Sequence, residues 1–144
     1  MDETMIERIE RDGVLYAIII RHNYEPEETT FFTSKDSSLQ FGITKHEEGY
    51  TEKPHVHNRV KKVIYEVHET LHLVQGKAVF DFYTEAGEKV STVILDKGDT
   101  VLLANGAHAM SVLKDCWGVK VKQGPYGSIE EDKQTVEVKN DTSL

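Results

Sequence analysis

The sequence has little of what stabilises or anchors a protein outside the cell. Its 144 residues include one cysteine, Cys116, so no internal disulfide can form, which is typical of a reducing compartment. No apolar run approaches the ~20 residues that cross a bilayer, and the longest, Val14–Ile20, has only the length of a strand. The acidic start, Met1–Glu7, lacks the basic and then apolar pattern of a signal peptide. These absences predict a cytoplasmic protein with no membrane partner.

The chain also lacks an excess of positive charge. Its formal net charge is -8, and its only basic cluster is Arg59-Val-Lys-Lys62, which argues against nucleic acid as a partner. No glycine-rich phosphate loop is present, so a nucleotide cofactor is not indicated. With 38% hydrophobic and 29% charged residues, the composition is ordinary for one globular domain over residues 1–144. We expect a core over about 14–126 and a frayed C-terminal tail.

What the chain does have is a series of short β-rich runs separated by turn residues. Thr84–Gly87 and Asp96–Asp99 read as hairpin turns, in which glycine supplies a positive φ. The frequent turns between alternating or β-branched runs favour an all-β sandwich or barrel. The expected strands cover residues 14–20, 29–33, 39–45, 77–83, 89–95, 100–103, 108–113 and 118–122.

Histidine spacing gives the first indication of chemistry. His55 and His57 are one residue apart, so on a strand both would point to one face. Glu69 and His108 follow in separate expected strands. Three histidines and one carboxylate from separate strands can surround a metal ion inside a barrel.

At these residues the chain resembles the cupin superfamily. Gly49 with His55-Val-His57, followed by Glu69 and Gly76, is similar to the first cupin motif, although the connection 58–68 is longer than is usual in the family. The stretch Gly98-Asp-Thr-Val-Leu-Leu-Ala-Asn-Gly-Ala-His108 is similar to the second motif. The resemblance implies a double-stranded β-helix, the cupin jelly-roll barrel. It also implies one divalent transition metal (Fe, Mn, Ni, Zn or Cu) held by His55, His57, Glu69 and His108.

Glu66 competes with Glu69 for the carboxylate position, and strand parity separates them. Glu69 shares a strand face with Leu71 and Leu73, whereas Glu66 shares the opposite, polar face with His68, Thr70 and His72. A ligand belongs on the face lined by core residues, so we expect Glu69 to point inward. His68 and His72 are then expected on the exterior or in an interface.

Other chemical residues have ordinary alternatives. Tyr126 is a candidate general acid at a cavity mouth, or it packs a turn. Asp99 reads as a turn cap and Cys116 as a small core residue. Arg21 and Lys45 are candidates to bind an anionic substrate, but solvent exposure is the commoner fate of such residues. His22 and His46 lie outside any motif.

The reaction is left open by the sequence, because one fold hosts many chemistries. Among single-domain cupins, the chain resembles small proteins of bacterial surface-polysaccharide pathways. This resemblance implies a metal-dependent enzyme acting on a small polar metabolite, such as a sugar or sugar-nucleotide isomerase or epimerase. The alternatives are a metal-dependent dioxygenase and a non-catalytic module that binds a sugar or metal.

We also expect a homodimer. The apolar run Val14–Ile20 is suited to pair with a second chain at a sheet edge, with the connection Asn58–Val67 at the same interface. The connection is expected to bulge outward and wall the pocket mouth, which would place Arg59, Lys61 or Lys62 near an anionic substrate.

Overall fold

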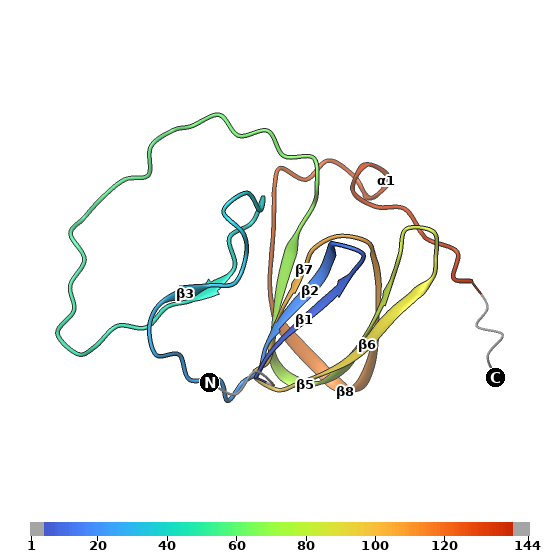
Figure 1. Ribbon diagram of the computed structural model, residues 1–144, viewed down its shortest axis with the longest axis horizontal. Coiled ribbons are helices and arrows are strands. Elements are labelled where there is room, and N and C mark those ends of the chain that lie inside the picture. The colour runs from blue at the N-terminus through green and yellow to red at the C-terminus, as the bar shows by residue number, and fades with distance from the viewer. Residues whose placement is uncertain (1–4, 140–144) are drawn as a thin grey trace.

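One large, curled antiparallel sheet dominates the computed structural model, which describes residues 5–139 (Figure 1). Six strands form this sheet, and a small second sheet pairs two others. The elements are β1 (Ile6–Arg11), β2 (Val14–Ile20), β3 (Thr30–Phe31), β4 (Gly42–Ile43), β5 (Glu69–Tyr83), β6 (Lys89–Asp96), β7 (Thr100–Leu103), β8 (Ala107–Lys122) and the single helical turn α1 (Ile129–Asp132). The expectation of an all-β chain is confirmed.

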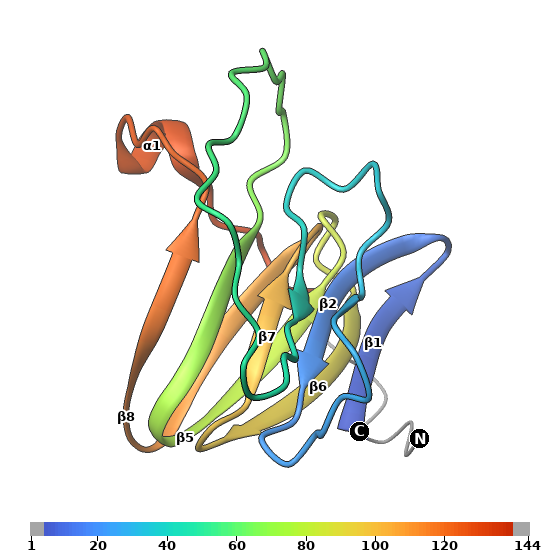
Figure 2. The same cartoon turned by 90° about the vertical axis from the view of Figure 1, so that its left-hand side faces the viewer.

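The strand β5 organises the sheet. Along one edge, its first residues pair with β7 and its last residues pair with β6, while its other edge pairs with β8 over nearly its whole length. The order of the remaining strands is β1-β2-β7-β5, so the N-terminal hairpin lies on the same side of β5 as β7. Because β5 bends midway, the sheet curls into a half-barrel, as Figure 2 shows.

The bend in β5 occurs at Gly76, where φ is +94°. The pairing of β5 with β8 shifts register on either side of this residue, between Leu73 and Ala78. A Cβ atom at Gly76 would collide with the carbonyl of Asp115 and with Cys116 across the strand pair. Only glycine therefore allows β8 to follow β5 around the bend.

The main core fills the inside of the curl. Alternate residues of β5 point into it, as expected of a strand with one buried face, and the rings of Phe80 and Phe82 lie 6.4 Å apart. The buried residues of this core are Tyr16, Ala17, Ile19, Leu73, Ala78, Phe80, Phe82, Val93, Leu95, Val101 and Leu103. Half-buried Cys116 packs against them, which confirms its interpretation as a small core residue.

The run Val14–Ile20 is apolar on both faces because both faces are covered. Ala17 and Ile19 belong to the main core, whereas Ile18 and Ile20 pack with Phe41 in a second core on the other side of the sheet. Both edges of this strand are also occupied, by β1 and by β7. The expectation that this run pairs with a second chain is therefore wrong.

A buried carboxylate joins the last strands to the first. Asp99 is only 1% exposed, and it accepts hydrogen bonds from the Asp96 and His22 backbone N–H groups (both 2.8 Å) and from the Arg21 guanidinium (2.8 Å). Arg21 also pairs with Glu7 at 3.0 Å. The interpretation of Asp99 as a turn cap is confirmed, and Arg21 is engaged in internal contacts.

Arginine side chains also reach the edge of β6. Arg21 donates to the carbonyl of Ile94 at 2.6 Å, and Arg11 donates to the carbonyl of Lys89 at 2.9 Å. Both arginines belong to the β1–β2 part of the chain, so these contacts link the two ends of the curl through side chains.

We expect Asp99 to make the stability of the protein depend on acid pH. Burial raises the pKa of Asp99, but the hydrogen bonds from Asp96, His22 and Arg21 outweigh it and hold the pKa below its ordinary value of 3.8. Because the pKa of Asp99 is lower in the folded state than in the unfolded state, its ionised carboxylate stabilises the fold at pH values above the ordinary pKa. This stabilisation is lost as the pH falls through the folded-state pKa. Urea unfolding at a series of acid pH values measures the loss. Asp99→Asn should flatten the curve in this window, and parallel curves for the two proteins would contradict the assignment.

The segment between β4 and β5 leaves the body of the protein. Every residue from 44 to 67 is exposed, and Figure 1 shows the segment running in a wide path away from the sheet before it returns at β5. No strand forms in this segment, so the strand expected at His55 and His57 is absent from the structure. Within residues 5–139, no helix is long and apolar enough to span a membrane.

Candidate functional site

Glu69 and His108 meet inside the curl. Glu69 is the first residue of β5 and His108 is the second residue of β8, and their register partners lie far apart along the strand pair. Because the strands curl, Glu69 Oε1 nevertheless lies 3.5 Å from His108 Nε2. The Glu69 side chain is 14% exposed, whereas His108 is 37% exposed. Two of the predicted metal ligands therefore share one position at the open end of the curl.

Strand parity places Glu69 as the sequence predicted. Leu73, on the same face, is buried, and Leu71 packs against the main core. Glu66 precedes the strand and is exposed. The expectation that Glu69, rather than Glu66, points inward is confirmed.

The surroundings favour the ionised form of Glu69. The contact with His108 lowers the pKa of Glu69, and this effect outweighs the burial that raises it. Lys120, whose Nζ lies 3.8 Å from Glu69 Oε1, lowers this pKa further. Glu69 is thus an anion at neutral pH, which is the form that binds a metal or a cationic group.

His55 and His57 do not lie beside this pair. They belong to the exposed segment 44–67, where their rings are 5.3 Å apart in an edge-to-face arrangement. His55 Nδ1 lies 3.1 Å from the carbonyl of Lys53 and 3.5 Å from Glu52. Within the described residues, no three His, Cys, Asp or Glu side chains gather closely enough to hold a metal ion.

The donor chemistry nevertheless suits a metal. An imidazole and a carboxylate are both ligands of divalent transition metals, and two imidazoles one residue apart supply the same kind of nitrogen donor. The folded body thus supplies two of the four predicted donors, and the exposed segment carries the other two.

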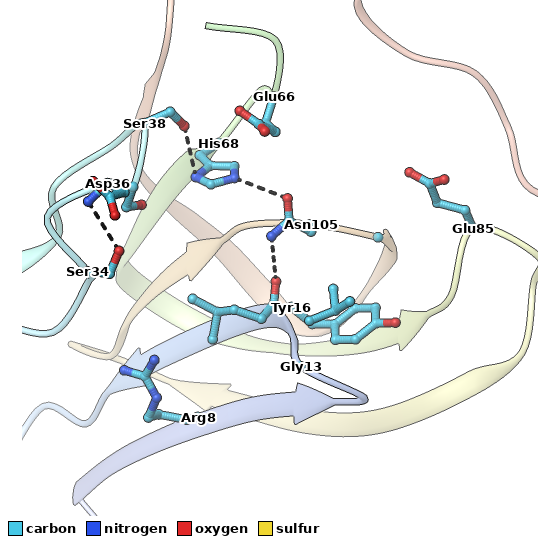
Figure 3. A pocket seen from close by; sticks show the side chains of 14 residues that line it. Arg8, Gly13, Tyr16, Ser34, Asp36, Ser38, Glu66, His68, Glu85 and Asn105 are labelled. Carbon is cyan, nitrogen blue, oxygen red and sulfur yellow. Dashed lines mark hydrogen bonds between the residues drawn. The ribbon is translucent and has the colours of Figure 1, made fainter.

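A separate pocket of about 780 Å³ lies on the other side of the start of β5 (Figure 3). His68, the neighbour of Glu69, faces this pocket and is only 6% exposed. Its ring nitrogens lie 3.3 Å from the Ser38 hydroxyl and 3.5 Å from the Asn105 side-chain oxygen. The polar residues lining the pocket are Arg8, Ser34, Asp36, Ser37, Ser38, Glu66, His68, Glu85 and Asn105.

The expectation that His68 is an exterior strand residue is wrong. The strand begins only at Glu69, and the His68 backbone N–H donates to the Gln123 side chain at 2.9 Å. Its ring lies under the loop that carries Ser38. Nothing in the local sequence separates His68 from His72, which is indeed exposed and hydrogen-bonds to Thr100 at 2.8 Å.

The remaining candidates are accounted for by ordinary contacts. Tyr126 is 60% exposed, and Lys122 Nζ lies 5.2 Å from the centre of its ring. His22 pairs with Asp99, and His46 stacks on Tyr50 at 4.1 Å. The backbone N–H of exposed Lys45 donates to the Thr29 hydroxyl at 3.0 Å.

Comparison of the chain with protein-family models, with curated protein sequences and with solved structures finds no match.

Proposed function

We propose that the protein is a metal-dependent jelly-roll protein that acts on a small polar metabolite. The observation that carries the proposal is the contact between Glu69 and His108, which lie 39 positions apart in the sequence and 3.5 Å apart at the mouth of the curl. His55 and His57 would supply the other two ligands when the segment 44–67 covers this mouth.

The bound metal would supply a Lewis acid that polarises an oxygen of the substrate. Glu69 and His108 would hold this metal at the end of the main core, where Phe80 lies 6.4 Å from the His108 ring. Lys120 is 56% exposed beside Glu69, so its ammonium group is placed to attract an anionic group of the substrate from solvent. A phosphorylated sugar or sugar nucleotide has both the oxygens and the negative charge that such a site favours.

The favoured reaction is the isomerisation or epimerisation of such a sugar, in keeping with the resemblance to small cupins of polysaccharide pathways. A metal-dependent dioxygenase is the alternative, because the same ligands suit iron.

The pocket at His68 favours a second candidate, the non-catalytic binding of a sugar. Hydroxyl groups from Ser34, Ser37 and Ser38, with the amide of Asn105, offer donors and acceptors that match a hydroxylated ligand. Binding there needs neither a metal nor the Glu69–His108 pair.

We expect the purified protein to bind one equivalent of Mn²⁺ or Zn²⁺ per chain. Glu69→Gln and His108→Ala should each weaken the affinity roughly 100-fold, because losing a ligand costs at least as much as losing one of its outer partners. Isothermal titration of metal-stripped protein measures the affinity.

His72→Ala is the matched control, since it removes an exposed histidine of β5 that lies outside the curl. Unchanged affinity in both site variants would refute the metal site. If the protein binds a sugar without metal, and Ser38→Ala weakens that binding, the second candidate is supported instead. Turnover of sugar nucleotides by the metal-loaded protein then distinguishes an enzyme from a binding module.

A further inference from the structure

Two features of the described residues 5–139 are left largely uncovered by the rest of the protein. The first is the segment 44–67, named the arm here. Its large apolar side chains are all exposed, from 43% at Ile64 to 89% at Tyr65. Lys45, at the start of the arm, exchanges two hydrogen bonds with Thr29, whereas the hydrogen bonds of Tyr50 and His55 stay within the arm itself. A segment with this many exposed apolar side chains, held away from its own core, is typical of one that packs against another molecule.

The second feature is the strand β8. Its partner in the sheet is β5, and no other described strand pairs with its second edge along its 16 residues. Figure 2 shows β8 as an outermost strand of the curl. Its exposed apolar side chains are Met110, Val112, Leu113, Trp117, Val119 and Val121, each at least 50% exposed. A long apolar edge strand is a template for pairing with another strand.

The area of the molecule indicates how much of this surface a partner should cover. The accessible surface is 11034 Å² for a chain of 16.4 kDa. A compact monomer of this mass exposes about 7,500 Å², so the chain has an excess of about 3,500 Å². This excess is several times the ~800 Å² that one partner contributes to a standard interface, and it exceeds the roughly 1,000–2,500 Å² per partner of many obligate homodimers.

We infer that the arm of one copy adds as a strand to the free edge of β8 in a second copy, and that the exchange is reciprocal. A second copy is the natural occupant because the chain carries both the exposed segment and the edge that accepts it, which is the requirement for a two-fold interface. The arm runs away from its own sheet, as Figure 1 shows, and is therefore positioned to reach another molecule.

The exchange would also complete the site. In the pairing of β5 and β8, His108 lies opposite Phe82 and so shares its inward face. When the arm extends as a strand, His55 and His57 point to one face. Pairing with β8 in the register that directs this face inward brings both histidines toward Glu69 and His108 of the second copy. This metal-binding consequence depends on the proposed function, whereas the strand exchange itself does not.

Sedimentation tests the exchange without any metal. We expect a dimer at micromolar concentration. Charges in the arm (Val60→Asp with Val63→Asp) or on β8 (Val112→Asp) should raise the dissociation constant at least 100-fold. Val138→Asp is the matched control, because Val138 is 50% exposed, close to Val112 at 52%, and lies outside both surfaces. Circular dichroism confirms that each variant keeps its strands. A monomeric wild-type protein, or a dimer that tolerates the arm and β8 charges, would overturn the inference.

Complementation tests the shared site. One variant carries His55→Ala with His57→Ala, and the other carries Glu69→Gln with His108→Ala. The two are co-expressed with different tags and purified as mixed dimers. Exchange between copies restores one intact site, and therefore one Zn²⁺ per mixed dimer, because the intact arm meets the intact body. If each arm served its own chain, no mixed dimer would bind Zn²⁺ although the wild type does, and the shared site would be refuted. An arm-dependent dimer that binds no metal would uphold the exchange and refute the proposed function alone.

Discussion

Replacing Asp99 with alanine is expected to lower the free energy of unfolding by about 3–5 kcal/mol, the range found when one partner of a buried ion pair is removed. Asp99 is 1% exposed and accepts four hydrogen bonds. Its loss leaves Arg21, which is only 20% exposed, with Glu7 as its one remaining carboxylate partner among residues 5–139. The melting temperature should fall by about 10 °C for a chain of this size.

Asp36→Ala is the matched control for this experiment, because Asp36 is an exposed loop residue. Its effect should stay within about 0.5 kcal/mol. Replacement of Asp99, Arg21 and Glu7 together by apolar residues should recover part of the loss, since all three charges of the network are then removed. A melting temperature for Asp99→Ala equal to that of the wild type would show that the network contributes nothing.

The second large effect is expected at the bend of β5. Gly76→Ala should lower the free energy of unfolding by about 2–5 kcal/mol, of which about 1–2 kcal/mol comes from the positive φ and about 1–3 kcal/mol from overpacking. The overpacking arises because the added Cβ meets the backbone carbonyl of Asp115, which cannot move without displacing β8.

Gly13→Ala separates the two contributions. Gly13 also has a positive φ, +76°, but a Cβ there would have no atom within 4 Å. This control should lose only the part due to φ, about 1–2 kcal/mol. Chemical denaturation of both variants gives the comparison, and equal losses at the two positions would rule out the collision at the bend.

Much of the fold was predictable because local patterns determined it. Alternation of apolar residues identified residues 77–83 and 89–95, and it also gave the inward direction of Glu69. Thr84–Gly87 and Asp96–Asp99 form the expected turns, closed by hydrogen bonds from Gly87 to Thr84 (2.9 Å) and from Asp99 to Asp96 (3.0 Å). Such signals depend on neighbours in sequence, which the chain itself displays.

The strands that the sequence did not predict correctly depend on contacts between residues far apart in the chain. The strand Ile6–Arg11 was not predicted, because its mixture of charged and apolar residues becomes a strand only by pairing with β2. The expected strands 29–33 and 39–45 shrink to the two-residue β3 and β4, since loops with their own hydrogen bonds replace them. The expected strands 108–113 and 118–122 join into one, because both follow the bent β5.

The candidate site also has one part that the sequence predicted and one part that it did not. The proximity of Glu69 and His108 was predicted from the resemblance, and the curl provides it. The position of His55 and His57 in an exposed segment was not predicted, because a histidine pair there has the same local sequence as a pair in a strand. Burial of His68 depends on Ser38 and Gln123, which lie 30 and 55 positions away.

The arginine contacts at the edge of β6 hinder one route to fibre formation. Fibres grow when each molecule offers two open strand edges, so that every addition leaves another edge available. Here the Ile94 and Lys89 carbonyls already accept hydrogen bonds from Arg21 and Arg11. Edge-to-edge polymerisation through β6 would have to break these bonds first. The guanidinium groups thus protect the edge of β6, and β8 is the longest strand with an unpaired edge among the described strands.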